Sequence, residues 1–131
     1  MAITKKWVII VDDDEDLQEM LSFAFKKEGF QVKQFLKGAS ALDYLSDEKH
    51  VKSAALLILD RILPDMDGLH ILKSFYAQSK IKPPVLILSV LSAEKDVLAG
   101  LKGGAVDYVV KPFSLPILMQ KALSLIARGE K

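Results

Sequence analysis

The sequence contains no cysteine, so disulfide bonds and thiolate metal sites are excluded. Aromatic residues make up only 8% of its 131 residues, whereas half of the residues are hydrophobic. This composition is typical of a globular domain with many aliphatic side chains. A strong charge imbalance is also missing, because the formal net charge is +1. Nothing global therefore indicates binding to nucleic acid or to a membrane surface.

Long hydrophobic runs are missing as well. The first apolar run, Trp7–Val11, has five residues, which is too short for a signal-peptide core or a membrane span. We therefore expect a cytoplasmic protein without membrane association. The length suits a single domain, which we expect to cover residues 1–131 with a core from about 6 to 128.

Short apolar runs alternate with amphipathic segments along the chain. Five runs are expected to form strands: Trp7–Val11, Phe30–Leu36, Ala54–Leu59, Val85–Leu88 and Tyr108–Val110. Apolar residues at helical spacing predict helices within 17–25, 39–45, 69–76, 97–101 and 115–126. This (βα)5 alternation predicts an α/β fold, with five helices on the two faces of a doubly wound, five-stranded parallel sheet.

The carboxyl ends of the expected strands carry the polar residues. Asp12 and Asp13 end the first strand, and Asp60, Ser89 and Lys111 end the third, fourth and fifth. In an open parallel sheet, ligands bind beyond this edge. Neighbouring carboxylates repel one another unless a cation compensates, and oxygen ligands favour Mg²⁺, with Mn²⁺ as the alternative, over zinc. We therefore predict an acidic cation-binding site.

Simpler structural explanations exist for each of these residues alone. Acids at 14–16 are explained by capping a helix and complementing its dipole. Asp60 alone is compatible with a turn, Ser89 with a strand end and Lys111 with a solvated surface. Their joint occurrence on one edge of one sheet favours a shared site.

Four segments resemble the receiver domain of response regulators in two-component signal transduction, of the chemotaxis-regulator type. They are VIIVDDD (8–14), LILDRILPDMDG (57–68), PVLILSV (84–90) and GAVDYVVKPF (104–113). The resemblance covers nearly the whole chain, from about Lys6 to about Arg128. It implies a flavodoxin-like fold with strand order 2-1-3-4-5.

The resemblance implies a role for each residue of the acidic edge. Asp60 would be the phosphoacceptor, which takes a phosphoryl group from the phosphohistidine of a histidine kinase or phosphotransfer protein. Mg²⁺ would be held by Asp13 directly, by Asp12 largely through water, by Asp60 and by the backbone carbonyl of Ile62. The product would be a phosphoprotein.

Further implied roles concern the response to phosphorylation. Ser89 and Lys111 would bind the phosphoryl oxygens, and Pro112 would follow a cis peptide bond. Ser89 and Tyr108 would form the switch, with plain packing as the alternative role of Tyr108. The face built by segments 97–101, 108–110 and 115–126 would then bind a partner, an output domain or a second copy as a homodimer.

Such a domain catalyses only its own phosphorylation and dephosphorylation, so it is not a conventional enzyme. The sequence shows no DNA-binding motif, so we expect no direct nucleic-acid binding by this chain. A stand-alone regulator, a phosphorelay intermediate and the receiver part of a longer protein all remain open.

The chain departs from the family pattern at the edge of the expected site. Val90 stands where a small residue is usual, and Ile62 and Leu91 stand where many relatives carry polar side chains. These positions lie near the path of the hydrolytic water. We therefore expect a phosphoprotein that hydrolyses slowly.

Three other functions fit the sequence less well. A Mg²⁺-dependent phosphohydrolase with an aspartate nucleophile would carry a DxD-type motif, whereas Asp12 and Asp13 are adjacent. A flavodoxin-like module that binds a cofactor phosphate would be disfavoured by the acids at 12–16. A degenerate receiver used only for protein interaction is disfavoured because the acid pair, Asp60, Ser89 and Lys111 are all present.

Overall fold

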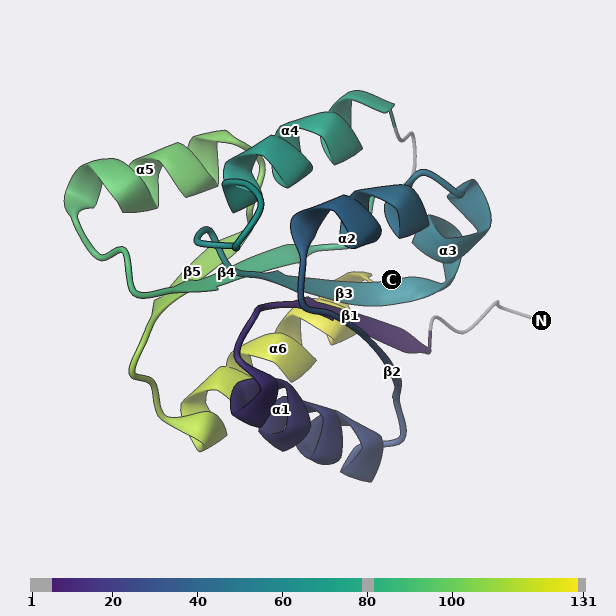
Figure 1. Cartoon of the computed structure of the whole chain (residues 1–131). Helices are drawn as coiled ribbons and strands as arrows, with labels where there is room; N and C mark the ends of the chain where they lie inside the picture. The colour runs from purple at the N-terminus through teal and green to yellow at the C-terminus, as the bar shows by residue number, and fades with distance from the viewer. Residues whose placement is uncertain (1–5, 79–81, 130–131) are drawn as a thin grey trace.

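Five strands form a parallel sheet with the strand order β2-β1-β3-β4-β5. The structure is a computed structural model that describes residues 6–78 and 82–129. Within these ranges the predicted α/β architecture and strand order are confirmed (Figure 1). The elements are β1 Trp7–Val11, α1 Glu15–Lys27, β2 Gln31–Phe35, α2 Gly38–Leu45, α3 Glu48–Ser53, β3 Ala54–Leu59, α4 Gly68–Gln78, β4 Val85–Ser89, α5 Glu94–Lys102, β5 Asp107–Val110 and α6 Leu115–Gly129.

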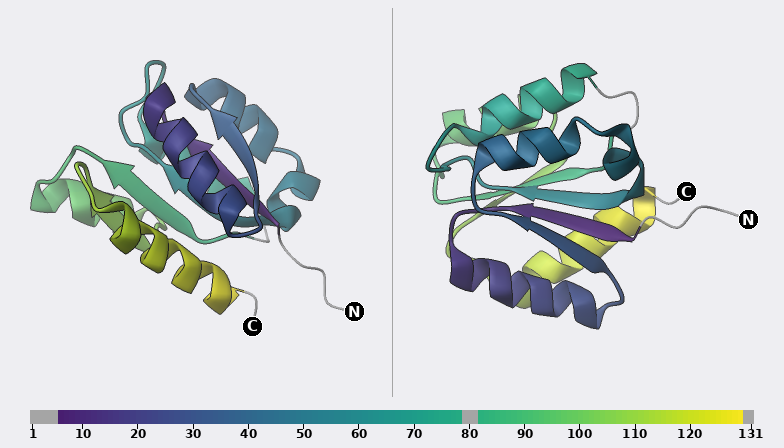
Figure 2. Two further views of the ribbon diagram at one scale, coloured as in Figure 1. Left: turned by 90° about the horizontal axis from the view of Figure 1, so that it is seen from below. Right: turned by 45° about the vertical axis from the view of Figure 1, so that its right-hand side comes forward.

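Side chains alternate between the two faces of the sheet and create a core on each side. Ile9 and Val11 of β1 pack with residues of α2, α3 and α4, whereas Val8 and Ile10 pack with residues of α1 and α6. Figure 1 shows α2 to α5 above the sheet and α1 and α6 below it, and Figure 2 shows the same layers from two other sides. The three central strands β1, β3 and β4 are therefore almost fully buried.

The structure contains one helix more than predicted, with six in the described residues. The additional helix, α3, is short and mostly polar, so its sequence has no clear apolar stripe. Asp47 caps it by accepting a hydrogen bond from the backbone N–H of Lys49 at 2.9 Å. The ring of His50 stacks on Tyr44 of α2 at 3.7 Å, which ties α3 to the preceding helix.

Local signals set the ends of the predicted helices. Asp14 caps α1 by accepting a hydrogen bond from the N–H of Leu17 at 3.1 Å. After α1, Gly29 has a φ of 93°, a left-handed conformation that glycine adopts without steric cost. Ser114 precedes α6 and accepts from the N–H of Ile117 at 3.4 Å. Among the described residues, no helix combines the length and the apolar character that a membrane span requires.

The register of the sheet aligns the carboxyl ends of its strands. Val11 of β1 is paired with Leu59 of β3, so the residues that follow them leave the sheet side by side. The backbone N–H of Asp60 donates to the carbonyl of Val11 at 2.9 Å. On the other side, the N–H of Lys111 donates to the carbonyl of Ser89 at 2.8 Å. The sheet thus brings four polar strand ends to one edge.

Candidate functional site

The first strand ends in one buried and one exposed carboxylate. Asp12 is 1% exposed, whereas Asp13 is exposed to solvent. One oxygen of Asp12, Oδ1, accepts a hydrogen bond from the N–H of Asp14 at 2.9 Å. Burial raises the pKa of Asp12, although its hydrogen bond from Lys111 acts in the opposite direction. The acid pair therefore combines a fixed, buried carboxylate with one that faces solvent.

Asp60 follows β3 and is 5% exposed. Both of its carboxylate oxygens have defined partners. Oδ1 accepts from the backbone N–H of Ile62 at 3.0 Å, and Oδ2 accepts from Nζ of Lys111 at 2.8 Å. The carboxylate is thus held in one orientation at the sheet edge.

Lys111 connects the two buried carboxylates. Its Nζ lies 2.7 Å from Oδ2 of Asp12 and 2.8 Å from Oδ2 of Asp60. Burial would lower the pKa of Lys111, but the two carboxylates outweigh this effect and raise its pKa above the ordinary value. The lysine is therefore charged at neutral pH. The peptide bond between Lys111 and Pro112 is cis, as the family resemblance implied.

The three carboxylates of this edge form a group of oxygen ligands. One oxygen from each of Asp12, Asp13 and Asp60 can be chosen so that all three lie within 4.8 Å of one another. Such a set of hard oxygen donors fits Mg²⁺, which keeps several of its waters and needs few protein ligands. Lys111 offsets only one of the three negative charges, so the group as a whole favours a bound cation.

Ser89 and Tyr108 are linked through the segment that follows β4. Ser89 is fully buried, and its hydroxyl accepts a hydrogen bond from the N–H of Leu91 at 3.3 Å. The hydroxyl of Tyr108 donates to the carbonyl of the same Leu91 at 2.7 Å. A displacement of Ser89 would therefore act on the residue that holds the Tyr108 ring.

Several contacts that fix the loop after Asp60 were not predicted from the sequence. The carboxylate of Asp65 accepts from the backbone N–H groups of Gly38 at 2.8 Å and Ala39 at 2.9 Å, at the start of α2. These two hydrogen bonds lower the pKa of Asp65, and the bond from Ala39 has the larger effect. At Gly68 an added Cβ would meet the backbone of Asp60. The motif LILDRILPDMDG contains Asp65 and Gly68, but only the structure shows the hydrogen-bond partners of Asp65 and the close approach of Gly68 to Asp60.

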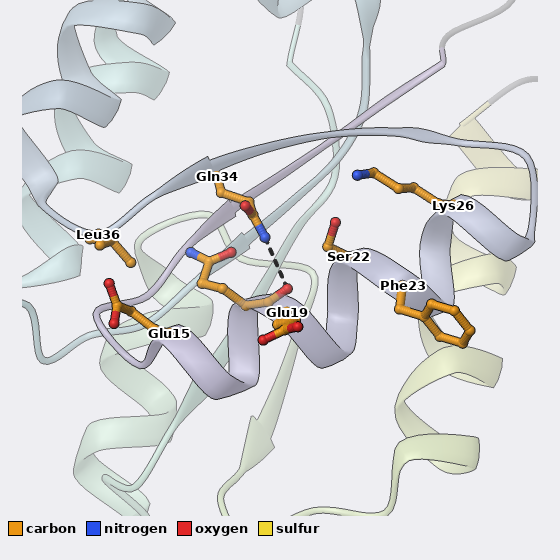
Figure 3. A pocket seen from close by; sticks show the side chains of 8 residues that line it. Glu15, Glu19, Ser22, Phe23, Lys26, Gln34 and Leu36 are labelled. Carbon is orange, nitrogen blue, oxygen red and sulfur yellow. Dashed lines mark hydrogen bonds between the residues drawn. The ribbon is translucent and has the colours of Figure 1, made fainter.

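Gln18 is a further residue that the sequence analysis did not single out. Its Nε2 lies 3.0 to 3.1 Å from the carbonyl oxygens of Ile10, Asp12 and Phe35, and thus ties α1 to the ends of β1 and β2. A polar residue inside the apolar stripe of α1 was the available signal. Gln34 of β2 donates to the backbone oxygen of Gln18 at 3.0 Å, as Figure 3 shows.

An open hollow of about 660 Å³ lies beside Gln18, between α1 and β2. Figure 3 shows the side chains of Glu15, Glu19 and Gln34 around it. None of the three metal-binding candidates lines this hollow. The acidic edge, rather than this depression, is therefore the candidate site.

Two of the three apolar departures from the family pattern lie exposed on the surface, whereas the third, Leu91, is half-buried. Val90 is 57% exposed and Ile62 is 47% exposed. Both lie close to the polar strand ends in the sequence, since Val90 directly follows Ser89 and Ile62 comes two residues after Asp60. The outer boundary of the site thus carries two uncovered aliphatic side chains.

Comparison with known proteins gives consistent matches. The family model described as the response regulator receiver domain matches residues 8–123. The transcriptional regulatory protein GltR of Pseudomonas aeruginosa is 33% identical over 131 residues, which are 99% of this chain and 52% of GltR. The sensory transduction protein RegX3 of Mycolicibacterium smegmatis is 36% identical over 122 residues, which are 93% of this chain and 51% of RegX3. The chain thus spans about half the length of these curated relatives.

Solved structures match over almost the whole chain. The BeF3-activated receiver domain of DrrB, a protein of Thermotoga maritima, is 29% identical and superposes with a TM-score of 0.82. The match covers 96% of this chain and 100% of that domain.

Proposed function

This chain belongs to the response-regulator receiver domain family of two-component signalling, and we propose that Asp60 is its phosphoacceptor. The observation that carries the proposal is the geometry of Lys111, whose ammonium bridges Asp60 and Asp12. The donor would be the phosphohistidine of a histidine kinase or phosphotransfer protein. The product would be an aspartyl phosphate on this chain.

The transfer is a nucleophilic displacement at phosphorus. A carboxylate oxygen of Asp60 forms the new O–P bond while the P–N bond of the phosphohistidine breaks. The electron pair of the broken P–N bond stays on the imidazole nitrogen. The N–H of Ile62 holds Oδ1 of Asp60, which fixes the direction of the carboxylate. Lys111 then exchanges its bond to Asp60 for one to a phosphoryl oxygen and stabilises the charge there.

Asp12, Asp13 and Asp60 are the residues that would hold Mg²⁺, together with the carbonyl of Ile62. The acidic donor set within 4.8 Å supports this assignment. When bound, Mg²⁺ would neutralise phosphoryl charge and orient the transferred group. Asp12 and Asp13 would supply the negative charge that attracts the cation in the absence of a phosphoryl group.

Ser89 and Lys111 would respond to phosphorylation by binding the phosphoryl oxygens. In the unphosphorylated protein, the Ser89 hydroxyl is occupied by the N–H of Leu91. The hydroxyl proton of Ser89 is not used in this bond, so it would be donated to a phosphoryl oxygen, which is a strong acceptor. Movement of the Ser89 side chain toward the phosphoryl group would then loosen its bond with Leu91. Because Leu91 also accepts the Tyr108 hydroxyl, the change would reach β5.

The responding surface would be the face formed by α5, β5 and α6. These elements correspond to the segments 97–101, 108–110 and 115–126 of the sequence analysis. Large apolar side chains are exposed in α5 and at both ends of β5, namely Leu98, Leu101, Val106 and Val110. They support binding to an output domain, a protein partner or a second copy of the chain.

Phosphorylation by a small-molecule donor tests the proposal. Purified protein is incubated with acetyl phosphate and Mg²⁺, and its intact mass is measured. We expect the wild type to gain the mass of one phosphoryl group. No mass should be added when EDTA is present before the donor, or when Asp60→Asn is used in place of the wild type. Asp43→Asn removes an exposed carboxylate of α2 and serves as the matched control. Phosphorylation of Asp60→Asn to the level of the control would refute the assignment.

The same preparation separates a receiver from a phosphohydrolase. A receiver consumes about one donor molecule for each aspartyl phosphate that forms and decays, whereas a phosphohydrolase turns over generic phosphoesters continuously. We expect no turnover of p-nitrophenyl phosphate above that of Asp60→Asn. Beryllofluoride, which activates the DrrB receiver domain, is the phosphoryl analogue that we expect to bind at Asp60.

A further inference from the structure

Arg61 is a buried arginine directly after the proposed phosphoacceptor. Its side chain is 8% exposed, although arginine is rarely so deeply buried without partners. Burial of its charge would lower the pKa of Arg61, but Asp67 and, to a smaller extent, Tyr108 raise it above the ordinary value. The guanidinium is therefore charged, and its partners come from outside β3.

Part of Arg61 closes the loop that follows Asp60. Its Nε and Nη2 face the two carboxylate oxygens of Asp67, each at 3.4 Å. Its backbone carbonyl accepts from the N–H of Gly68 at 2.8 Å, and Ile62 forms a β-bridge with Asp67. Asp67 also accepts from the N–H of Leu69 in the first turn of α4. Arg61 thus holds together the two ends of the loop between β3 and α4.

The third nitrogen of Arg61 reaches a different element. Nη1 donates to the backbone carbonyl of Asp96 at 3.0 Å and lies 3.9 Å from its carboxylate. Asp96 belongs to the first turn of α5, whose N-cap residue Ala93 provides no side-chain hydrogen bond. One planar guanidinium therefore bonds to the loop after Asp60 and to α5 simultaneously.

We propose that Arg61 is a positioning residue that couples the loop after Asp60 to α5. This inference rests on the proposed phosphorylation of Asp60. A rigid, forked cation with partners on two elements transmits displacement between them, because its contacts cannot all be kept if one element moves alone. Arg61 also interacts with Tyr108, so this connection meets the one through Ser89 and Leu91 at the Tyr108 side chain, but it reaches α5 directly through Asp96.

Exchange of backbone amides measures the coupling. Amide hydrogen exchange is recorded for the full chain with Mg²⁺, with and without beryllofluoride, in the wild type, Arg61→Met and Arg61→Lys. Met fills a similar volume without charge, and Lys keeps the charge but lacks the fork that serves both partners. Arg128→Met removes an exposed arginine in the last turn of α6, beyond the segment 115–126 of the proposed responding face, and is the matched control.

In the wild type and in Arg128→Met, we expect beryllofluoride to change exchange near Asp60 and Ser89 and also throughout α5. In both Arg61 variants the change near Asp60 should persist, while most of the change in α5 should be lost. The analogue should bind Arg61→Met more tightly, on the order of 5-fold or more, because its binding no longer has to rearrange α5. Arg61→Lys gives the same information if Arg61→Met fails to fold.

The possible failures are distinguishable. If α5 responds in both Arg61 variants as it does in the wild type, the coupling role of Arg61 is overturned while the proposed function stands. If the wild type shows no response near Asp60, the proposed function itself fails. A purely structural role would lower the melting temperature of Arg61→Met but would leave the analogue-induced difference in α5 intact, and this result would also overturn the inference.

Discussion

Asp13→Asn is the substitution that tests the electrostatics of the acidic edge most directly. In the absence of metal, Asp13 adds a third negative charge to a group that Lys111 only partly compensates. The chosen oxygens of the group lie within 4.8 Å of one another, and two unit charges at this upper limit repel by about 3.5 kcal/mol at an effective dielectric constant of about 20. Asp13 is exposed, so water and salt reduce this to about 1 kcal/mol. The neutral amide should therefore stabilise the metal-free protein.

The sign of the effect should reverse when Mg²⁺ is present. The wild type should gain about 2.7 kcal/mol of unfolding free energy at a Mg²⁺ concentration 100-fold above its Kd. Asp13→Asn lacks a proposed direct ligand and should gain far less at the same concentration. One substitution is thus expected to stabilise the protein in EDTA and to destabilise it, relative to the wild type, in Mg²⁺.

Thermal unfolding followed by circular dichroism measures both effects. In EDTA, we expect the melting temperature of Asp13→Asn to exceed that of the wild type by roughly 3 to 5 °C. Asp43→Asn changes the net charge equally at a distant position and should show neither effect. A lower melting temperature of Asp13→Asn in EDTA, or an undiminished response to Mg²⁺, would contradict the reasoning.

Three further predictions concern the surroundings of the site. Gly68→Ala should lower the unfolding free energy by about 1 to 3 kcal/mol and slow phosphorylation, because its Cβ would meet the backbone of Asp60, the proposed phosphoacceptor. In Gly129→Ala the new Cβ lies 3.9 Å from its nearest neighbour, so urea unfolding should be nearly unchanged. Hydrogen bonds from the N–H groups of Ala39 and Gly38 lower the pKa of Asp65, so this carboxylate stabilises the fold at a pH above its unfolded pKa of about 3.9. Asp65→Ala should therefore melt at a lower temperature than the wild type at pH 7. This difference should shrink as the pH falls below about 4. The aspartyl phosphate should decay slowly in Mg²⁺ and faster in Val90→Ala, and a wild-type half-life of seconds would refute the role assigned to the exposed apolar rim.

The order of the elements was predictable from the sequence because each central strand is buried on both faces. The runs Trp7–Val11 and Ala54–Leu59 are continuous and apolar, and the structure places strands with the same bounds there. The expected strand Phe30–Leu36 is shorter in the structure, where β2 covers Gln31–Phe35. It lies at the sheet edge, where burial places few constraints on composition. The strand order came from the family resemblance rather than from the residues.

The membership of the site was also predictable, whereas its supports were not. Asp12, Asp60 and Lys111 stand at strand ends, and parallel strands bring their carboxyl ends to one edge. Asp65 and Arg61 act on partners that are 26 to 35 residues away in the chain. Nothing in their local sequence indicates those partners, because they depend on how α2 and α5 pack against the loop after β3.

If Asp60 is phosphorylated as proposed, the contacts of Asp65 and Arg61 explain how this small change can produce a defined response. The loop after Asp60 is held on one side by Asp65, which bonds to the first turn of α2, and on the other by Arg61, which bonds to the first turn of α5. The α2 connection joins an exposed carboxylate to backbone groups, and it ends on a helix that packs into the core. The α5 connection ends on a helix that carries exposed apolar residues such as Leu98 and packs on Tyr108 through Gly100. A displacement at Asp60 should therefore be resisted on the α2 side and expressed on the α5 side.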